Sequence, residues 1–224
     1  RTAELIRPIL RGRDIKRYSY DWANLWLIAT FPSRHYNIED YPAVKDYLLN
    51  FGIERLEQTG KTNLVNGKNV KSRKKTNNKW FETQDSISYW EDFNKPKIVW
   101  KIIGSRLAFT IDKNKYIINN ACYLMTGNHL MYILAFLNSS PLIWYSEITN
   151  KNKTGVGDAQ VGAQNIILFP IPKHSKEYNN INKLVHVLLG NPNDNFVKNA
   201  LSDKINKIYG LNKTEIQYLT CLNL

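Results

Sequence analysis

Four cations lie close together near the start of the chain, within the sequence LRGRDIKRYSYDW (residues 10–22). They are Arg11, Arg13, Lys16 and Arg17. Lysine and arginine neutralise phosphates, and an arginine also binds guanine O6 and N7 through two hydrogen bonds. The four side chains are therefore predicted to form one edge that faces phosphates or guanine bases.

The other residues of this stretch are expected to hold that edge in place. Asp14 is expected to fix one of the arginines, because an oriented guanidinium loses less entropy on binding. Tyr18, Tyr20 and Trp22 are expected to bury the opposite side of the segment. The alternative is a charged linker that its tyrosines pack against the protein.

A second basic stretch, GKTNLVNGKNVKSRKKTNNK, spans residues 60–79 and contains no acid. Its seven cations are Lys61, Lys68, Lys71, Arg73, Lys74, Lys75 and Lys79. Glycine and asparagine residues predict a long mobile loop without regular structure. Such a loop can make several phosphate contacts, each of which releases condensed counterions. The alternative is a solvated loop without a partner.

Two aromatic residues, Trp80 and Phe81, follow this basic stretch. They are expected to anchor the loop in a core rather than stack on bases.

The sequence contains no self-contained catalytic site. The glycine-rich stretch TGVGDAQVG precedes an expected strand and lacks the third glycine of a dinucleotide-binding fingerprint. Glu91, Asp92, Lys95 and Lys97 can be arranged as a metal-nuclease pattern, but such spacing arises by chance in charged proteins. Two distant cysteines without a neighbouring ligand do not predict a metal site. We therefore expect no catalytic residue, metal or cofactor in this chain, and a reducing, cytoplasmic location.

The charge balance points to an anionic partner. The 224 residues include 31 Lys and Arg against 19 Asp and Glu, a formal net charge of +12. This excess favours nucleic acid over an anionic membrane surface or simple solubility. No apolar run approaches the roughly 20 residues of a membrane span, and 43% hydrophobic residues are enough for a core. Because the chain begins with Arg1, we expect it to be a piece of a longer protein.

Pattern and spacing predict an α+β fold, with a mixed β-sheet first and a helical C-terminal part. A short helix is expected before Pro8, a buried strand over 25–31, and a helix from 39 with its first turn at Pro42 and an interruption at Gly52. Its apolar stripe would comprise Val44, Tyr47, Leu48 and Phe51. Further strands are expected at 97–103, 106–111, 121–126 and 165–171. Helices are expected over 129–149 with a break at 139–141, and at 178–189, 194–209 and 214–222 with Thr214 as the cap. The expected parts are residues 1–125, which include the basic loop 60–79, and residues 126–224.

The order of several segments resembles a known family. These are IRPILRGRDIKRY, WLI, YPAVKDYLLNFGIERLEQ, a variable basic loop, KWFETQ, KPKIVWKII, INNACYLMTG, YILAFLNSSPLIWY, LFPIP and DKINKIYGLNKTEI. This succession resembles the TaqI-like C-terminal specificity domain of adenine-specific DNA methyltransferases, including the fused type IIG restriction-modification enzymes. Each motif alone is weak, and the resemblance rests on their order over nearly the whole chain.

The resemblance implies a target recognition domain that binds double-stranded DNA. A methyltransferase domain of the same longer chain would hold S-adenosylmethionine and flip out the adenine. The N-P-P-[YF] motif of that domain is absent here, so this part is expected to read sequence without catalysis. Asp158, Gln160 and Gln164, in the loop 154–164, are residue types that read base edges. The alternatives are a specificity subunit of a type I restriction system, which bridges methyltransferase subunits, and a stand-alone nuclease.

Overall fold

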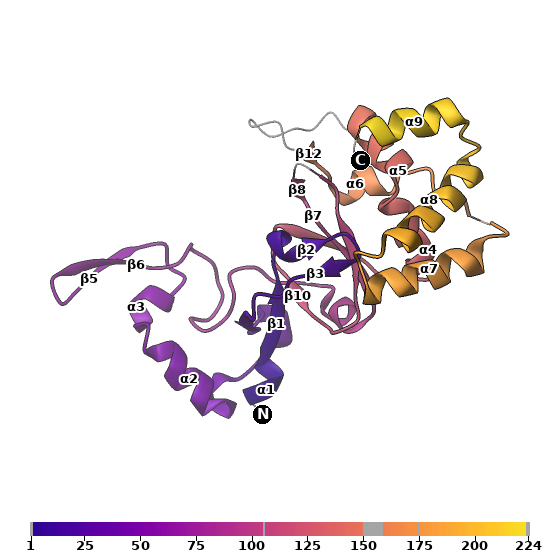
Figure 1. The fold of residues 1–224 in the computed structure, drawn as a ribbon. Helices are drawn as coiled ribbons and strands as arrows, with labels where there is room; N and C mark the ends of the chain where they lie inside the picture. The colour runs from indigo at the N-terminus through magenta and orange to yellow at the C-terminus, as the bar shows by residue number, and fades with distance from the viewer. Residues whose placement is uncertain (1, 105, 150–158, 174, 223–224) are drawn as a thin grey trace. The chain divides into compact units, whose positions relative to one another are not determined.

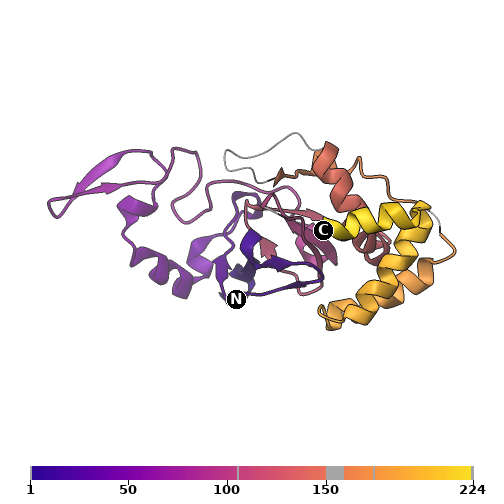
Figure 2. The same cartoon turned by 45° about the horizontal axis from the view of Figure 1, so that its top comes forward.

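The computed structural model describes residues 2–104, 106–149, 159–173 and 175–222. The chain divides into two units. Unit 1 comprises residues 1–8 and 26–91, and unit 2 comprises residues 9–25 and 92–224. The expected boundary near residue 125 therefore falls inside unit 2. The expected α+β class is confirmed, because both units combine helices with small sheets (Figures 1 and 2).

Unit 1 is a small helical core with strands at its margins. Helix α1 (Thr2–Leu5) leads into β1 (Ile6–Leu10), whose first residues pair antiparallel with β4 (Trp26–Ile28). Helices α2 (Pro42–Leu49) and α3 (Ile53–Leu56) follow, separated at Gly52, and strands β5 (Thr62–Val65) and β6 (Lys68–Lys71) form a hairpin. The buried core consists of Leu5, Ile38, Tyr41, Val44 and Phe81.

Unit 2 is built on a central antiparallel sheet. Strand β7 (Lys97–Lys101) lies between β11 (Cys122–Met125) and β9 (Phe109–Asp112). Short strands surround it: β2 (Ile15–Lys16) with β3 (Ser19–Tyr20), β8 (Ile103–Gly104) with β12 (Ala159–Gln160), and β10 (Ile117–Ile118) parallel to the end of β1. Trp100 and Phe109 of this sheet pack with the helices in one large buried cluster.

Helices follow the sheet in unit 2, as the sequence predicts. They are α4 (Leu130–Leu137), α5 (Ser140–Thr149), α6 (Ala163–Ile166), α7 (Tyr178–Gly190), α8 (Asn195–Tyr209) and α9 (Lys213–Cys221). The predicted break between α4 and α5 is confirmed at Ser139. The cap of α9 is Asn212 and not Thr214, because the Asn212 side chain accepts the Glu215 amide at 3.0 Å. None of the described helices is long and apolar enough to cross a membrane.

Three expectations about apolar runs are wrong in detail. Residues 165–171 form the end of α6 and a turn instead of a strand, and Ile167 and Leu168 are 76% and 71% exposed. On α2 only Val44 of the expected stripe is fully buried, while Tyr47 and Phe51 stack edge to face on the surface. Trp26 of the expected buried strand is 56% exposed. An apolar run alone cannot distinguish a buried strand from a helix end or a surface patch.

A buried ion pair ties two strands of the unit 2 sheet together. Lys97 and Asp112 are partners in the β7–β9 register, and both side chains are fully buried. The Lys97 ammonium donates to the Asp112 carboxylate at 2.5 Å and to the Phe93 carbonyl at 2.9 Å. The carboxylate also accepts the amides of Asn114 and Tyr116. Every charge in this pair is thus hydrogen-bonded, as burial requires.

Candidate nucleic-acid interface

Residues 62–71 of the basic stretch 60–79 form a β-hairpin, whereas residues 72–79 contain no helix or strand. Strands β5 and β6 pair antiparallel from Thr62 and Lys71 to Val65 and Lys68. Asn66 and Gly67 form the turn, with φ of 49° and 74°. Positive φ at both central residues is the type I′ geometry that an Asn-Gly pair favours. This dipeptide was therefore a hairpin signal, which the expectation of a mobile loop overlooked.

Arg73 holds the base of the hairpin. Its guanidinium donates to the carbonyls of Leu56 at 2.7 Å, Glu82 at 2.8 Å and Trp80. Burial lowers the pKa of this guanidinium from its ordinary value. Each guanidinium nitrogen of Arg73 thus donates to a main-chain carbonyl of unit 1, and so this predicted DNA-contacting residue also has a structural role.

Buried polar side chains complete this anchor. The Ser72 amide and hydroxyl both donate to the Lys61 carbonyl at 2.8 Å. The amide of Gln58 donates to the carbonyls of Lys79 and Glu82. Ser72, Gln58 and Glu82 are all less than 8% exposed. A base hydrogen-bonded in this way orders the strands that rise from it.

The remaining cations of the stretch lie on the surface. All of them are exposed, namely Lys61, Lys68, Lys71, Lys74, Lys75 and Lys79. The ammonium group of Lys79 lies 5.7 Å from the centre of the Phe81 ring. Phe81 is buried in the unit 1 core and Trp80 packs against that core, which confirms their expected role as an anchor. Unit 1 therefore has six exposed lysines on or near the hairpin in sequence. The hairpin itself extends beyond α2 and α3 (Figures 1 and 2).

The first basic stretch is divided in unit 2 between structural and exposed cations. Arg11 and Asp14 flank a single 3₁₀ turn, and the Arg11 guanidinium donates to the Asp14 carboxylate at 2.7 and 3.2 Å. The Arg11 amide donates to the same carboxylate at 2.8 Å. This confirms that Asp14 fixes an arginine. A Cβ at Gly12, between them, would lie 3.2 Å from the Ala121 carbonyl oxygen, a close contact that favours glycine.

The Asp14 carboxylate has a lowered pKa. Burial by itself raises this pKa, but hydrogen bonds from the Arg11 side chain and amide, with the nearby Arg11 and Arg13 charges, bring it below its ordinary value. Asp14 raises the pKa of Arg11 in turn, chiefly through the hydrogen bond. Arg11 is therefore oriented by a local ion pair with Asp14.

Arg17 forms the β2–β3 turn with Tyr18 and also has a structural contact. Its guanidinium donates to the Asn138 carbonyl. The residue as a whole is exposed, yet its guanidinium end is surrounded by protein, and this burial and the Arg106 charge lower its pKa. Tyr18 is buried with a φ of 63°, and burial raises its pKa to about 12. Of the four cations of the predicted edge, Arg13, Lys16 and Arg17 are exposed and Arg11 is paired with Asp14.

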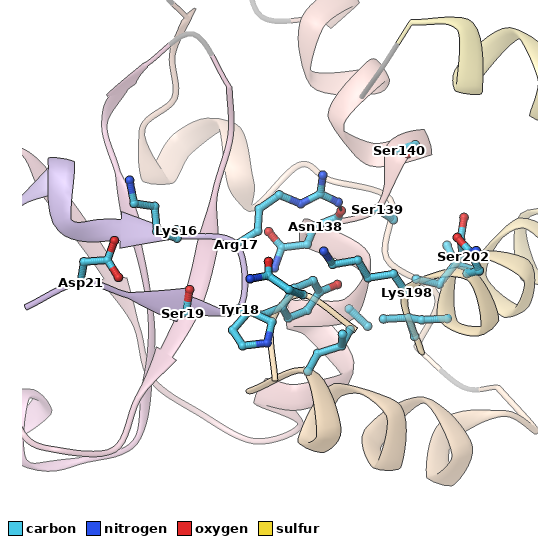
Figure 3. Close-up of a pocket in the computed structure, with 17 residues that line it drawn as sticks. Lys16, Arg17, Tyr18, Ser19, Asp21, Asn138, Ser139, Ser140, Lys198 and Ser202 are labelled. Atoms are coloured by element: carbon cyan, nitrogen blue, oxygen red, sulfur yellow. Dashed lines mark hydrogen bonds between the residues drawn. The ribbon is translucent and has the colours of Figure 1, made fainter. Parts of the chain in front are cut away.

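A polar hollow of about 790 Å³ lies beside the β2–β3 turn of unit 2 (Figure 3). Its rim comes from this turn, from the α4–α5 junction at Asn138–Ser140 and from the start of α8. Figure 3 shows Arg17 and Lys198 gathered with Asn138 at this site. Lys16, Arg17 and Lys198 line it with one acid, Asp21. Three cations against one acid favour binding of an anionic group such as a phosphate.

Sequence reasoning missed Lys198, because nothing in the α8 pattern indicates that it meets the β2–β3 turn.

Two of the three expected base-reading residues of loop 154–164, Gln160 and Gln164, lie in the described part of the chain. Gln160 belongs to β12 and is exposed, paired in register with Ile103 of β8. Gln164 is an exposed residue of α6. Asp158 lies outside the described residues. The lysines between 61 and 79 belong to unit 1, whereas Arg13, Lys16 and the two glutamines belong to unit 2.

The nuclease pattern is not assembled. Glu91 forms an ion pair with Arg34 at 3.7 Å, and Asp92 forms one with Lys95 at 2.7 Å. Lys97 forms the buried ion pair with Asp112. Among the described residues there is no group of three or more metal-ligating side chains. Burial raises the pKa of the Cys122 thiol to about 12, which disfavours the thiolate form that acts as a nucleophile.

One family model matches this chain. It is the TaqI-like C-terminal specificity domain, and the match covers residues 7–171. The matched region includes the β5–β6 hairpin, the 3₁₀ turn at Arg11–Asp14 and the β7–β9–β11 sheet, and it ends before α7. This is nearly three quarters of the sequence, and the order of motifs noted above falls within it for the most part. The chain belongs to the family of TaqI-like C-terminal specificity domains.

Proposed function

We propose that this chain is the target recognition part of an N6-adenine DNA methyltransferase or of a type IIG restriction-modification enzyme. Its family supports a role in DNA target recognition in restriction-modification systems. We further propose that the modified base is adenine. The proposed partners are double-stranded DNA, a methyltransferase domain of the same longer chain, and S-adenosylmethionine bound by that domain.

The observation that carries the DNA-binding proposal is the hairpin of unit 1. A two-stranded β-ribbon is one of the two elements that fit the major groove of B-DNA. Arg73 and Ser72 form hydrogen bonds at the base of this ribbon. Lys68 and Lys71 lie on β6 and four more exposed lysines flank the two strands in sequence, while residues 60–79 contain no acid. Phosphate contacts from these lysines position the ribbon, while side chains on the strands meet the bases.

The experiment is a comparison of two triple variants in DNA binding at several salt concentrations. Replacement of Lys68, Lys71 and Lys74 with alanine removes three hairpin cations. Each lost phosphate contact is expected to reduce the slope of log K against log salt by about 0.9. Binding to all duplexes should weaken together, because these contacts carry no sequence information.

The matched control removes the same charge elsewhere. Lys183, Lys207 and Lys213 are exposed residues of α7, α8 and α9, beyond the region that the family model matches. Their replacement with alanine should leave the salt slope nearly unchanged. Equal slopes for both triple variants would mean that the hairpin is not the DNA-binding element. Methyl transfer by the 224-residue chain, supplied with S-adenosylmethionine, would contradict the assignment of catalysis to another domain.

A further inference from the structure

The two faces of the β5–β6 hairpin differ in exposure. The register pairs Thr62 with Lys71 and Leu64 with Asn69 on one face. All four of these side chains are exposed, and Leu64 is 74% exposed. The opposite face carries Asn63, Val65 and Val70, which are partly buried, and Lys68. The exposed face of the hairpin is defined here as Thr62, Leu64, Asn69 and Lys71.

Leu64 and Asn69 are paired across the exposed face of the hairpin. They are directly opposite each other, so their Cβ atoms lie roughly 4.5–5.5 Å apart. Water surrounds most of the Leu64 side chain, which is therefore accessible to a partner. The pair lies one step from the tip, where a Cβ added to Gly67 would meet no described atom within 4 Å. Lys71 lies on the same face, nearer the base.

We propose that Leu64 and Asn69 together read one adenine–thymine pair from the major groove. An asparagine amide bonds adenine N6 and N7, and an apolar side chain contacts the thymine methyl group. Both features lie on the major-groove edge of the same base pair. The order along the face agrees with the groove, because the pair near the tip reaches the bases while Lys71 stays near the phosphates at the rim. This inference rests on the proposed DNA-binding function.

The test begins with selection of duplexes from a random pool by the unaltered 224-residue chain. The selected site is then bound by Asn69→Ala and Leu64→Ala variants and by the control Asn63→Ala. Asn63 lies on the other face of the same hairpin, so its loss should leave site preference intact. Asn69→Ala is expected to lose roughly 5- to 100-fold of the preference for adenine at one position. Leu64 and Asn69 are both exposed, so their replacement should leave the hairpin folded. Hydrogen exchange of the hairpin amides checks this.

Modified bases then identify the atoms that are read. Replacement of adenine with 7-deazaadenine removes the N7 acceptor, and it should weaken the unaltered chain but not Asn69→Ala. Replacement of thymine with uracil removes the methyl group, and it should weaken the unaltered chain but not Leu64→Ala. The inference would be overturned if the modified bases weakened binding by the unaltered chain and by the matching variant equally. It would also be overturned if the Asn69→Ala and Leu64→Ala variants lost affinity for all duplexes alike. If the unaltered chain enriches no sequence at all, the proposed function itself fails.

Discussion

At the scale of single residues, the structure separates cations that the sequence leaves alike. Arg73 and Lys74 are neighbours in an acid-free run, yet one bonds three carbonyls of its own unit and the other is exposed. Arg11 and Arg13 differ in the same manner around the 3₁₀ turn. Charge and spacing predict two basic surfaces, but the division between structural and exposed cations depends on contacts distant in sequence. Only the Arg11–Asp14 pair, three residues apart, could be predicted.

The Asp14 carboxylate predicts a pH dependence of stability. Its pKa in the folded chain is lowered, so its contribution is present above the ordinary carboxyl pKa and is lost as pH falls through the lowered value. An Asp14→Asn variant should therefore unfold at lower urea concentration than the unaltered chain at about pH 7. The difference between the two should narrow towards about pH 3. A difference that stays constant over this range would show that ionisation of Asp14 is not coupled to folding.

At the scale of elements, the Arg73 contacts predict how the hairpin is held. An Arg73→Met variant removes the guanidinium donor from the carbonyls of Leu56 and Trp80, and it leaves the Glu82 carbonyl with the Gln58 amide alone. Loss of these hydrogen bonds should lower the free energy of local opening by about 2 kcal/mol. The measurement is amide hydrogen exchange across β5 and β6. Lys74→Met, an exposed neighbour, is the control and should change exchange little. Equal protection in both variants would remove Arg73 as the anchor.

The elements also show where sequence patterns suffice. The α4–α5 break, the division of α2 from α3 at Gly52 and the strands of the central sheet follow from local signals such as glycine, proline and apolar runs. The hairpin turn was also predictable from Asn66-Gly67. The structure of residues 165–171 could not be predicted in this way. A short helix begins after Gly162, whose amide donates a hydrogen bond to the Asn165 side chain. That contact competes with the strand tendency of the isoleucines that follow.

At the scale of the whole molecule, the net charge of +12 makes binding to any polyanion favourable. Charge alone therefore does not distinguish a specificity domain from a basic protein, and the distinction lies in competition. Sequence-specific proteins typically prefer their site over other duplexes by roughly 10³-fold or more. Heparin should displace the 224-residue chain from random duplexes at low concentration, and from its selected duplex only at much higher concentration. The Lys68, Lys71 and Lys74 triple variant should weaken both complexes, whereas Asn69→Ala should bring the selected duplex towards the random one. If heparin strips both duplexes from the unaltered chain at the same concentration, its affinity is electrostatic only, and the ordered hairpin has no part in reading sequence.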